Sequence, residues 1–224
     1  MQGEPPVVVL RLGHRPGRDD RMTTHVGLTA RALGADRVVL AGDASQARET
    51  VADITDRFGG PFEVSLVESG LSTLREWDGR IVHLTMYGLP IQDIEGEVRA
   101  AHREEPLLVV VGAEKVPYEV YDRAGWNVAV TNQPHSEVAS LAVFLDRLFE
   151  GRELDREWVD AEREVIPRAS GKRVEPAENG TEREVEGGAD RDAGTRTDPG
   201  AETGSGGTTG TRGDAGERGD VNPE

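Results

Sequence analysis

The sequence of 224 residues contains no cysteine, and its only lysines are Lys115 and Lys172. The absence of cysteine excludes a disulfide framework, a zinc-thiolate site and a cysteine nucleophile. No apolar run approaches the roughly 18 residues that a membrane-spanning helix needs, and the N-terminus lacks the basic and then apolar layout of a secretory signal peptide. We therefore expect a cytoplasmic protein with no membrane association.

Aromatic and branched apolar side chains are scarce in the C-terminal quarter. Residues 171–224 hold 13 glycines, no aromatic residue, and only Val174, Val185 and Val221 as branched apolar residues. Such a segment cannot bury enough apolar surface to offset the entropy lost on ordering its chain. We therefore expect one folded domain over residues 1–170 and a disordered, glycine-rich and acidic tail over residues 171–224.

Basic residues are outnumbered, because 26 Lys and Arg stand against 42 Asp and Glu, for a net charge of -16. The tail carries -6 of this charge and residues 1–170 carry the remaining -10. Carboxylates keep a surface hydrated, and in concentrated salt their repulsion is screened over only about 3 Å. The composition indicates a halophilic protein, and an ordinary acidic protein is the alternative.

Short runs of valine and leucine alternate with amphipathic stretches of helix length. The pattern predicts strands over residues 7–12, 37–40, 62–67, 80–85, 107–111 and 127–131, and helices over residues 24–33, 45–58, 91–103, 118–124 and 135–149. Alternation of this kind is typical of an α/β fold with a mostly parallel sheet and helices on both faces. Residues 152–165, with Leu154, Trp158 and Val165 among charges, suggest one more helix.

Three segments that follow predicted strands combine Gly or Pro with small polar residues: Thr85–Pro90, Gly112–Pro117 and Thr131–Glu137. In open parallel sheets a ligand binds beyond the carboxyl ends of the strands. We therefore expect a pocket where these three loops meet, although each loop alone is compatible with an ordinary strand end. Ser136 or Asn132 is also suited to cap the last helix. Neither a dinucleotide fingerprint nor a P-loop is present.

Four arginines, Arg11, Arg15, Arg18 and Arg21, lie close together after the first strand of an otherwise acidic chain. The guanidinium group is well matched to phosphate oxygens, so the cluster suggests contact with a phosphate-bearing partner. Pairing with Asp19, Asp20 and other acids of the chain is the alternative. His14 and His25 lie in the same segment, but no third residue has the spacing of a metal ligand, so we expect no metal site.

These residues resemble a known family, the archaeal tRNA (cytidine-56) 2'-O-ribose methyltransferases of the SPOUT superfamily. The resemblance rests on Leu10–Pro16 with Thr23–Val26, on Leu84–Gly88, on Val111–Pro117 and on Asn127–Glu137, and it spans about residues 7–167. It implies an enzyme that transfers a methyl group from S-adenosylmethionine to the ribose 2'-hydroxyl of cytidine 56 in the T-loop of tRNA. It also implies a C-terminal trefoil knot and a homodimer, with part of the contact made by Leu141–Phe149.

The resemblance places a set of loop residues around the cofactor: Leu84, Gly112, Ala113, Glu114, Lys115, Val116, Val130, Thr131, Asn132, Gln133, Pro134, His135, Ser136 and Glu137. The superfamily assigns catalysis to an arginine before a Thr-Ala dipeptide, but here Leu28 precedes Thr29 and Ala30. We therefore assign the catalytic role to Arg21 or Arg15, and tRNA binding to Arg11, His14, Arg15 and Arg18.

An arginine with a pKa above about 12 is a poor base, so we expect it to clamp phosphate while the proton passes to phosphate or water. Two other functions stay open. One is a non-catalytic tRNA-binding protein on the same fold. The other is a phosphate-recognising hydrolase that uses the arginines with His14 and His25 and needs a metal.

Overall fold

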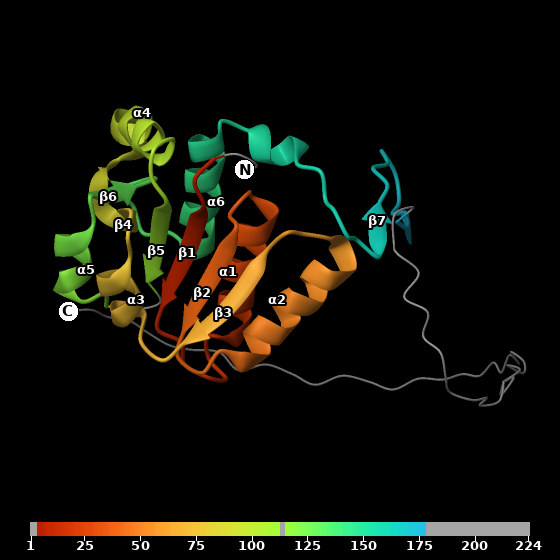
Figure 1. The fold of residues 1–224 in the computed structure, drawn as a ribbon, viewed down its shortest axis with the longest axis horizontal. Helices are drawn as coiled ribbons and strands as arrows, with labels where there is room; N and C mark the ends of the chain where they lie inside the picture. The colour runs from red at the N-terminus through yellow and green to blue at the C-terminus, as the bar shows by residue number, and fades with distance from the viewer. Residues whose placement is uncertain (1–3, 113–114, 178–224) are drawn as a thin grey trace, which may run out of the picture. The chain divides into compact units, whose positions relative to one another are not determined.

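The computed structural model describes residues 4–112 and 115–177, which contain a six-stranded parallel sheet (Figure 1). The strand order is β3-β2-β1-β5-β4-β6. The strands are β1 (Val7–Leu12), β2 (Arg37–Ala41), β3 (Glu63–Val67), β4 (Arg80–Pro90), β5 (Leu107–Gly112) and β6 (Trp126–Ala129). Every pairing in this sheet is parallel, which confirms the predicted α/β architecture.

Helices cover both faces of the sheet, as predicted (Figure 1). One face carries α1 (Asp20–Ala32), α2 (Ser45–Phe58), α4 (Ile91–His102) and α6 (Glu137–Phe149). The other face carries α3 (Gly70–Glu76) and α5 (Tyr118–Arg123). The apolar side chains of α6 are buried in the core of their own chain, so little of the apolar surface expected for a subunit contact is exposed.

Successive side chains of β1 point to opposite faces of the sheet. Val7 and Val9 lie in the core under α1 and α6, while Val8 and Leu10 lie in the core under α3 and α5. Because side chains alternate along a strand, Arg11 points to the first face and Leu12 to the second. Arg11 is thereby buried although it is charged.

The neighbouring strands β1 and β5 form the switch point of the sheet. The helix after β1 is α1, which packs on one face, and the helix after β5 is α5, which packs on the other. The loops after these two strands diverge, and this leaves a crevice beyond the carboxyl ends, where ligands bind in folds of this class.

Two helices differ from the prediction. α1 begins at Asp20 rather than Thr24, because the carboxylate of Asp20 accepts a bond from the Gly17 N–H and so closes the preceding turn. The short helix α3 was not predicted, although Ser69 caps it by accepting a bond from the Ser72 N–H at 3.4 Å. Its seven residues are too few to show a helical period.

The prediction of a helix over residues 152–165 is wrong. The segment forms a 3₁₀ turn over Arg152–Asp155 and then a strand, β7 (Arg163–Val165), which pairs with the antiparallel strand β8 (Val174–Pro176). Between them, Val159 forms an isolated bridge with Gly60, and its carbonyl accepts from the Gly60 N–H at 2.9 Å. Long-range backbone bonds therefore override the local helical spacing.

The domain boundary expected at Ser170 falls between these two strands. β8 pairs Val174 with Val165, so ordered structure continues past that boundary to Ala177. The remainder of the expected tail, residues 178–224, lies outside the described residues.

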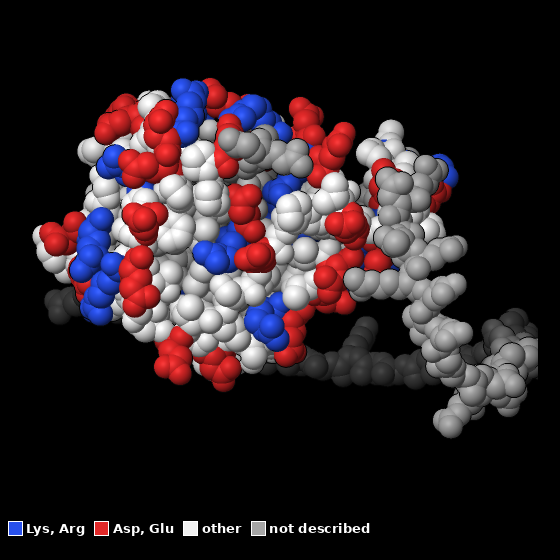
Figure 2. All heavy atoms as spheres, in the orientation of Figure 1, with Lys and Arg blue, Asp and Glu red and all other residues white. Residues whose placement is uncertain are grey.

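Acidic side chains are spread over the face of the molecule seen in Figure 2, with basic ones interspersed singly and in small groups. Several exposed arginines form ion pairs, such as Arg80 with Glu105 and Arg147 with Glu95.

Candidate functional site

A cavity of about 430 Å³ opens at the switch point, beyond the carboxyl edge of the sheet. The residues that line it come from the loops after four strands: Leu12 to Arg15 and Asp19 after β1, Ala41 and Gly42 after β2, Glu68 to Leu71 after β3, and Gly112 with Lys115 to Pro117 after β5. It therefore combines the arginine-rich segment with one of the three predicted ligand loops. Of the three loops predicted to meet at a pocket, only the loop after β5 lines this cavity.

Gly70 allows α3 to approach β1 closely beside this cavity. A Cβ atom at Gly70 would lie 2.6 Å from Cδ2 of Leu12 and 3.2 Å from Cβ of Ala41. The start of α3 therefore rests directly on the ends of β1 and β2. At the other end of α3, Arg75 donates to Glu119 of α5, which also accepts a bond from Arg123. These two arginines lower the pKa of Glu119 to about 2.

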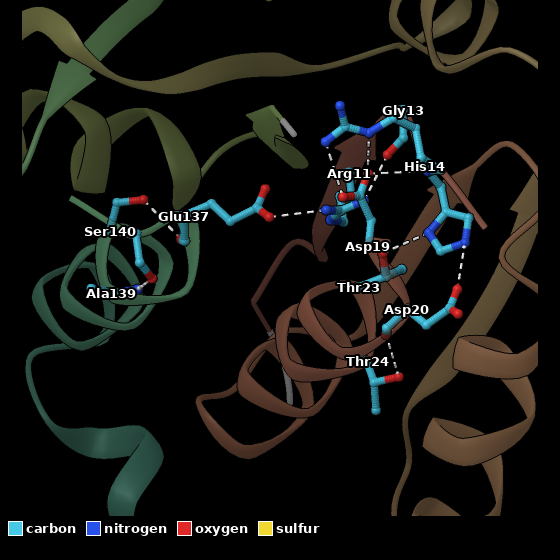
Figure 3. Close-up of polar contacts among 12 residues, drawn as sticks. Arg11, Gly13, His14, Asp19, Asp20, Thr23, Thr24, Glu137, Ala139 and Ser140 are labelled. Carbon is cyan, nitrogen blue, oxygen red and sulfur yellow. Dashed lines mark hydrogen bonds and ion pairs between the residues drawn. The ribbon is translucent and has the colours of Figure 1, made fainter. Parts of the chain in front are cut away.

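Arg11 and Glu137 form a buried ion pair on the opposite side of the sheet (Figure 3). Arg11 Nη2 lies 2.9 Å from Glu137 Oε1, and Arg11 Nη1 donates to the Gly13 carbonyl at 2.6 Å. Burial raises the pKa of Glu137, while the adjacent Arg11 opposes that rise. Arg11 is only 1% exposed, so in this chain it holds α6 to β1 rather than presenting a charge to tRNA.

His14 fixes the arginine-rich segment to α1 (Figure 3). Its Nδ1 lies 2.8 Å from Thr23 Oγ1, and its Nε2 lies 3.0 Å from Asp20 Oδ1. Both ring nitrogens are therefore used within the chain. The His14 side chain is 2% exposed, so it is buried within the loop and stabilises the loop's conformation.

Arg15 and Asp19 form a bidentate pair within the same loop. Arg15 donates from Nε and Nη2 to the two carboxylate oxygens of Asp19, at 3.0 and 3.1 Å. The Arg15 N–H also donates to Asp19, and this bonding lowers the pKa of the Asp19 carboxyl. The alternative of internal pairing thus holds for Arg15, although its side chain remains 36% exposed at the mouth of the cavity.

Arg18 and Arg21 are exposed at the tip of the loop and in the first turn of α1. Within residues 4–112 and 115–177, neither guanidinium group forms a hydrogen bond or an ion pair. Of the four arginines in the cluster, these two present their charges outward. His25 is also exposed and lies one turn further along α1.

The predicted cofactor residues after β6 lie beside the irregular part of β4. Asn132 donates from its side-chain amide to the carbonyls of Met86 and Gly88, at 2.7 and 3.1 Å. Ser136 caps α6 by accepting from the Ala139 N–H at 3.2 Å, so Ser136 and not Asn132 is the capping residue. Residues 131–136 are exposed, and the backbone N–H groups of all of them except Pro134, which has none, donate to no other described residue.

The remaining predicted cofactor residues divide between two places. Gly112, Lys115 and Val116 line the cavity, whereas Leu84 is buried in the core next to β6. Val130, Thr131, Gln133, Pro134 and His135 belong to the exposed loop that leads into α6. Ala113 and Glu114 lie outside the described residues. None of the loop residues after β6 lines the cavity.

Glu68 and Ser69 are residues of the cavity that the sequence analysis missed. They follow β3, whose carboxyl end lies at the same edge of the sheet as that of β1. The segment Glu68-Ser69-Gly70 carries a signal, because a polar pair and a glycine directly after a strand match the pattern of the three predicted ligand loops.

No helix in residues 4–112 and 115–177 is long and apolar enough to cross a lipid bilayer. In the same part of the chain, no three His, Asp or Glu side chains are arranged to hold a metal ion. The geometry thus gives no support to a metal-dependent hydrolase built on the described side chains His14 and His25.

Comparison with known proteins identifies the family. Residues 58–175 match the family described as "tRNA ribose 2'-O-methyltransferase, aTrm56". The tRNA (cytidine(56)-2'-O)-methyltransferase of Natronomonas pharaonis is 68% identical over 178 residues, which cover 80% of this chain and 99% of that protein. The enzyme of the same name from Pyrococcus abyssi is 54% identical over 171 residues, covering 75% of this chain and 86% of that protein.

The fold has a counterpart among solved structures. A crystal structure of an RNA 2'-O ribose methyltransferase superimposes with a TM-score of 0.50 at 15% identity, covering 67% of this chain and 58% of that one. At this identity the likeness concerns the fold alone. Since the family match spans more than half of the chain and the archaeal relatives are far more similar, the chain belongs to the family of tRNA ribose 2'-O-methyltransferases.

Proposed function

We propose that this protein transfers a methyl group from S-adenosylmethionine to the ribose 2'-hydroxyl of cytidine 56 in tRNA. The observation that carries the proposal is the 68% identity to a tRNA (cytidine(56)-2'-O)-methyltransferase over 99% of that protein's length. Haloarchaeal relatives and the acidic surface support the further proposal that the enzyme works in concentrated salt. An enzyme that acts on tRNA in an archaeon works in the cytoplasm.

The loop over residues 130–136 fits a cofactor that is recognised through the backbone. The N–H groups of residues 131–133, 135 and 136 donate to no other described residue, so they can donate to the nitrogen atoms of an adenine ring. The amide of Asn132 holds this loop against Met86 and Gly88, and so keeps two of the three predicted cofactor loops together. When bound, the cofactor supplies an electrophilic methyl group.

A trefoil knot is part of the proposal, and the contacts between β4 and β6 support it. Val128 pairs with Leu84 and again with Leu89, so the residues between them form an irregular segment of β4 that lies out of register with β6. Gly88 lies against β6 so closely that a Cβ atom there would lie 2.3 Å from the Asn127 carbonyl oxygen. A loop closed around a strand that continues into a helix is the geometry that such a knot needs.

The chain must position the ribose hydroxyl and stabilise the charge that develops as it loses its proton. We assign phosphate binding to Arg18 and Arg21, because their charges face outward. Arg15 is retained as a candidate catalytic residue beside Arg21, since it lies at the mouth of the cavity, and Asp19 fixes its orientation. The proton passes to the RNA phosphate or to water.

We propose a homodimer in which the exposed apolar residues around the knot are covered by a second copy. Tyr87, Leu89 and Tyr118 are 74%, 61% and 81% exposed, which is unusual for side chains of this size. They belong to the end of β4 and the start of α5, near the proposed cofactor loops. Analytical ultracentrifugation in concentrated KCl tests this proposal, which predicts a dimer for the wild type and a monomer for Leu89→Glu.

Methyl transfer from labelled S-adenosylmethionine tests the proposed activity directly. The substrates are an unmodified archaeal tRNA transcript and the same transcript with a 2'-deoxyribose at position 56. Label on the first and none on the second would establish both the reaction and the site. Equal label on both would refute position 56, and no label on either, with the cofactor bound, would favour a non-catalytic tRNA-binding protein.

A further inference from the structure

The cavity beside the start of α3, at the carboxyl edge of the sheet, has a size suited to a nucleoside and lies next to one of the proposed cofactor loops. Its volume of about 430 Å³ is within the range of small-molecule pockets. One wall is the loop after β5, through Gly112, Lys115 and Val116, and the resemblance places this same loop around the cofactor. A group bound in the cavity therefore lies against the segment that would hold the methyl donor.

The walls of the cavity suit a flat base with polar edges. Leu12, Leu71 and Val116 supply apolar surface to the cavity. An aromatic base that leaves its stack in a folded RNA needs such surface to replace the contacts it loses.

The carboxylates of Asp19 and Glu68 line the cavity, and they differ in how many further hydrogen bonds they can accept. Asp19 already accepts three bonds from Arg15, from the backbone N–H, Nε and Nη2. Glu68 is exposed to the cavity, and it makes no hydrogen bond or ion pair within the described part of the chain. Glu68 is therefore the carboxylate with free acceptor positions.

We propose that this cavity binds the cytosine base of the target nucleotide and that Glu68 selects cytosine by accepting a hydrogen bond from its exocyclic amine. Cytosine presents an N4 donor at the position where uracil presents an O4 acceptor, so a carboxylate there attracts the first and repels the second. Lys115 lines the cavity with a charge that suits an adjoining phosphate. This assignment rests on the proposed function and specifies the residue that determines its base specificity.

The test compares methylation of transcripts with cytidine and with uridine at position 56 by wild type, Glu68→Gln, Glu68→Ala and the control Glu76→Gln. Glu76 is exposed at the far end of α3 and lines no described part of the cavity, so its change leaves the base site intact. The amide that Glu68→Gln introduces offers a donor to the O4 of uracil, so we expect this variant to lower the cytidine-to-uridine ratio of rates by about tenfold or more. Glu68→Ala should lower the rate with cytidine.

Binding of S-adenosylmethionine, measured by equilibrium dialysis, should be the same in all four proteins and shows that the variants are folded. An unchanged cytidine-to-uridine ratio in both Glu68 variants would overturn the assignment of Glu68 while leaving the proposed methyltransferase in place. A wild type that binds S-adenosylmethionine but labels no transcript would overturn the proposed function and this assignment with it. A ratio that falls equally in Glu76→Gln would also overturn the assignment, because the effect would not belong to the cavity.

Discussion

Arg11 of β1 and Glu137 of α6 are 126 positions apart in the chain and form a buried ion pair with 2.9 Å between Nη2 and Oε1. The pair joins the first strand to the helix that follows the proposed cofactor loop. In the described structure, Arg11 Nε and Glu137 Oε2 have no hydrogen-bond partner, so each charge depends strongly on the other. The ion pair therefore acts as a brace, meaning that it stabilises the position of the loop over residues 130–136.

Breaking this pair by Arg11→Met should lower the free energy of unfolding by about 3–5 kcal/mol, because a buried carboxylate loses its only counter-charge among the described residues. The double variant Arg11→Met/Glu137→Leu should recover most of that loss, since no charge is then left buried. Urea unfolding in constant KCl measures both. A cost of less than about 1 kcal/mol for Arg11→Met would show that the pair is not the brace described here.

Glu119, which Arg75 and Arg123 hold at a pKa of about 2, should make stability sensitive to acid. A folded-state pKa below the ordinary value of 4.5 means that the ionised group stabilises the fold above that pH and loses this effect as pH falls toward 2. Glu119→Gln should therefore be less stable than wild type at pH 6, and the difference should shrink toward pH 3. Urea midpoints across this range give the comparison, and a difference that is constant with pH would contradict it.

Arg18→Glu should weaken tRNA binding by tenfold or more while leaving binding of S-adenosylmethionine unchanged, because Arg18 faces outward at the tip of the loop. The matched control is Arg103→Glu, an exposed arginine just beyond α4 at the amino edge of the sheet. Filter binding at several KCl concentrations separates this local contact from the general charge effect. Equal losses in the two variants would refute a role for the loop.

Trp158 holds the segment between α6 and β7 against the buried guanidinium group of Arg31, 4.3 Å from the centre of its ring. Trp158→Ala should speed tryptic cleavage after Arg156 several-fold, since a cation-π contact of about 0.5–2 kcal/mol is lost together with ring packing. Trp158→Phe keeps a ring and should be cleaved at nearly the wild-type rate. Equal cleavage of all three proteins would show that the segment is held by other contacts.

A chain that ends at Ala177 should keep both activity and stability, because it retains the pairing of β7 with β8. The relative from Natronomonas pharaonis is matched over 99% of its length by only 178 residues of this chain, which supports a dispensable extension. A chain that ends at Ser170 should have a lower urea midpoint, since β7 loses its partner. Loss of methyl transfer on truncation at Ala177 would show that the extension takes part in function.

The sequence by itself determined the sheet, most of the helices and the family. Valine-rich strands such as Leu107–Gly112 carry a strong local signal, because a strand buried on both faces must be apolar along its whole length. The family motifs are similarly local, since each is a continuous run of residues. Short elements such as α3, whose helix holds only seven residues, fall below what a period can reveal.

Tertiary structure alone decided what the charged residues do. Four arginines that look equivalent in sequence divide into Arg11, buried with Glu137, Arg15, paired with Asp19, and Arg18 and Arg21, which face outward. Glu68 joined the cavity because parallel strands bring their carboxyl ends to one edge whatever their distance along the chain. The partner, the burial and the orientation of each charged side chain depend on contacts across the sheet, and no local sequence pattern encodes those contacts.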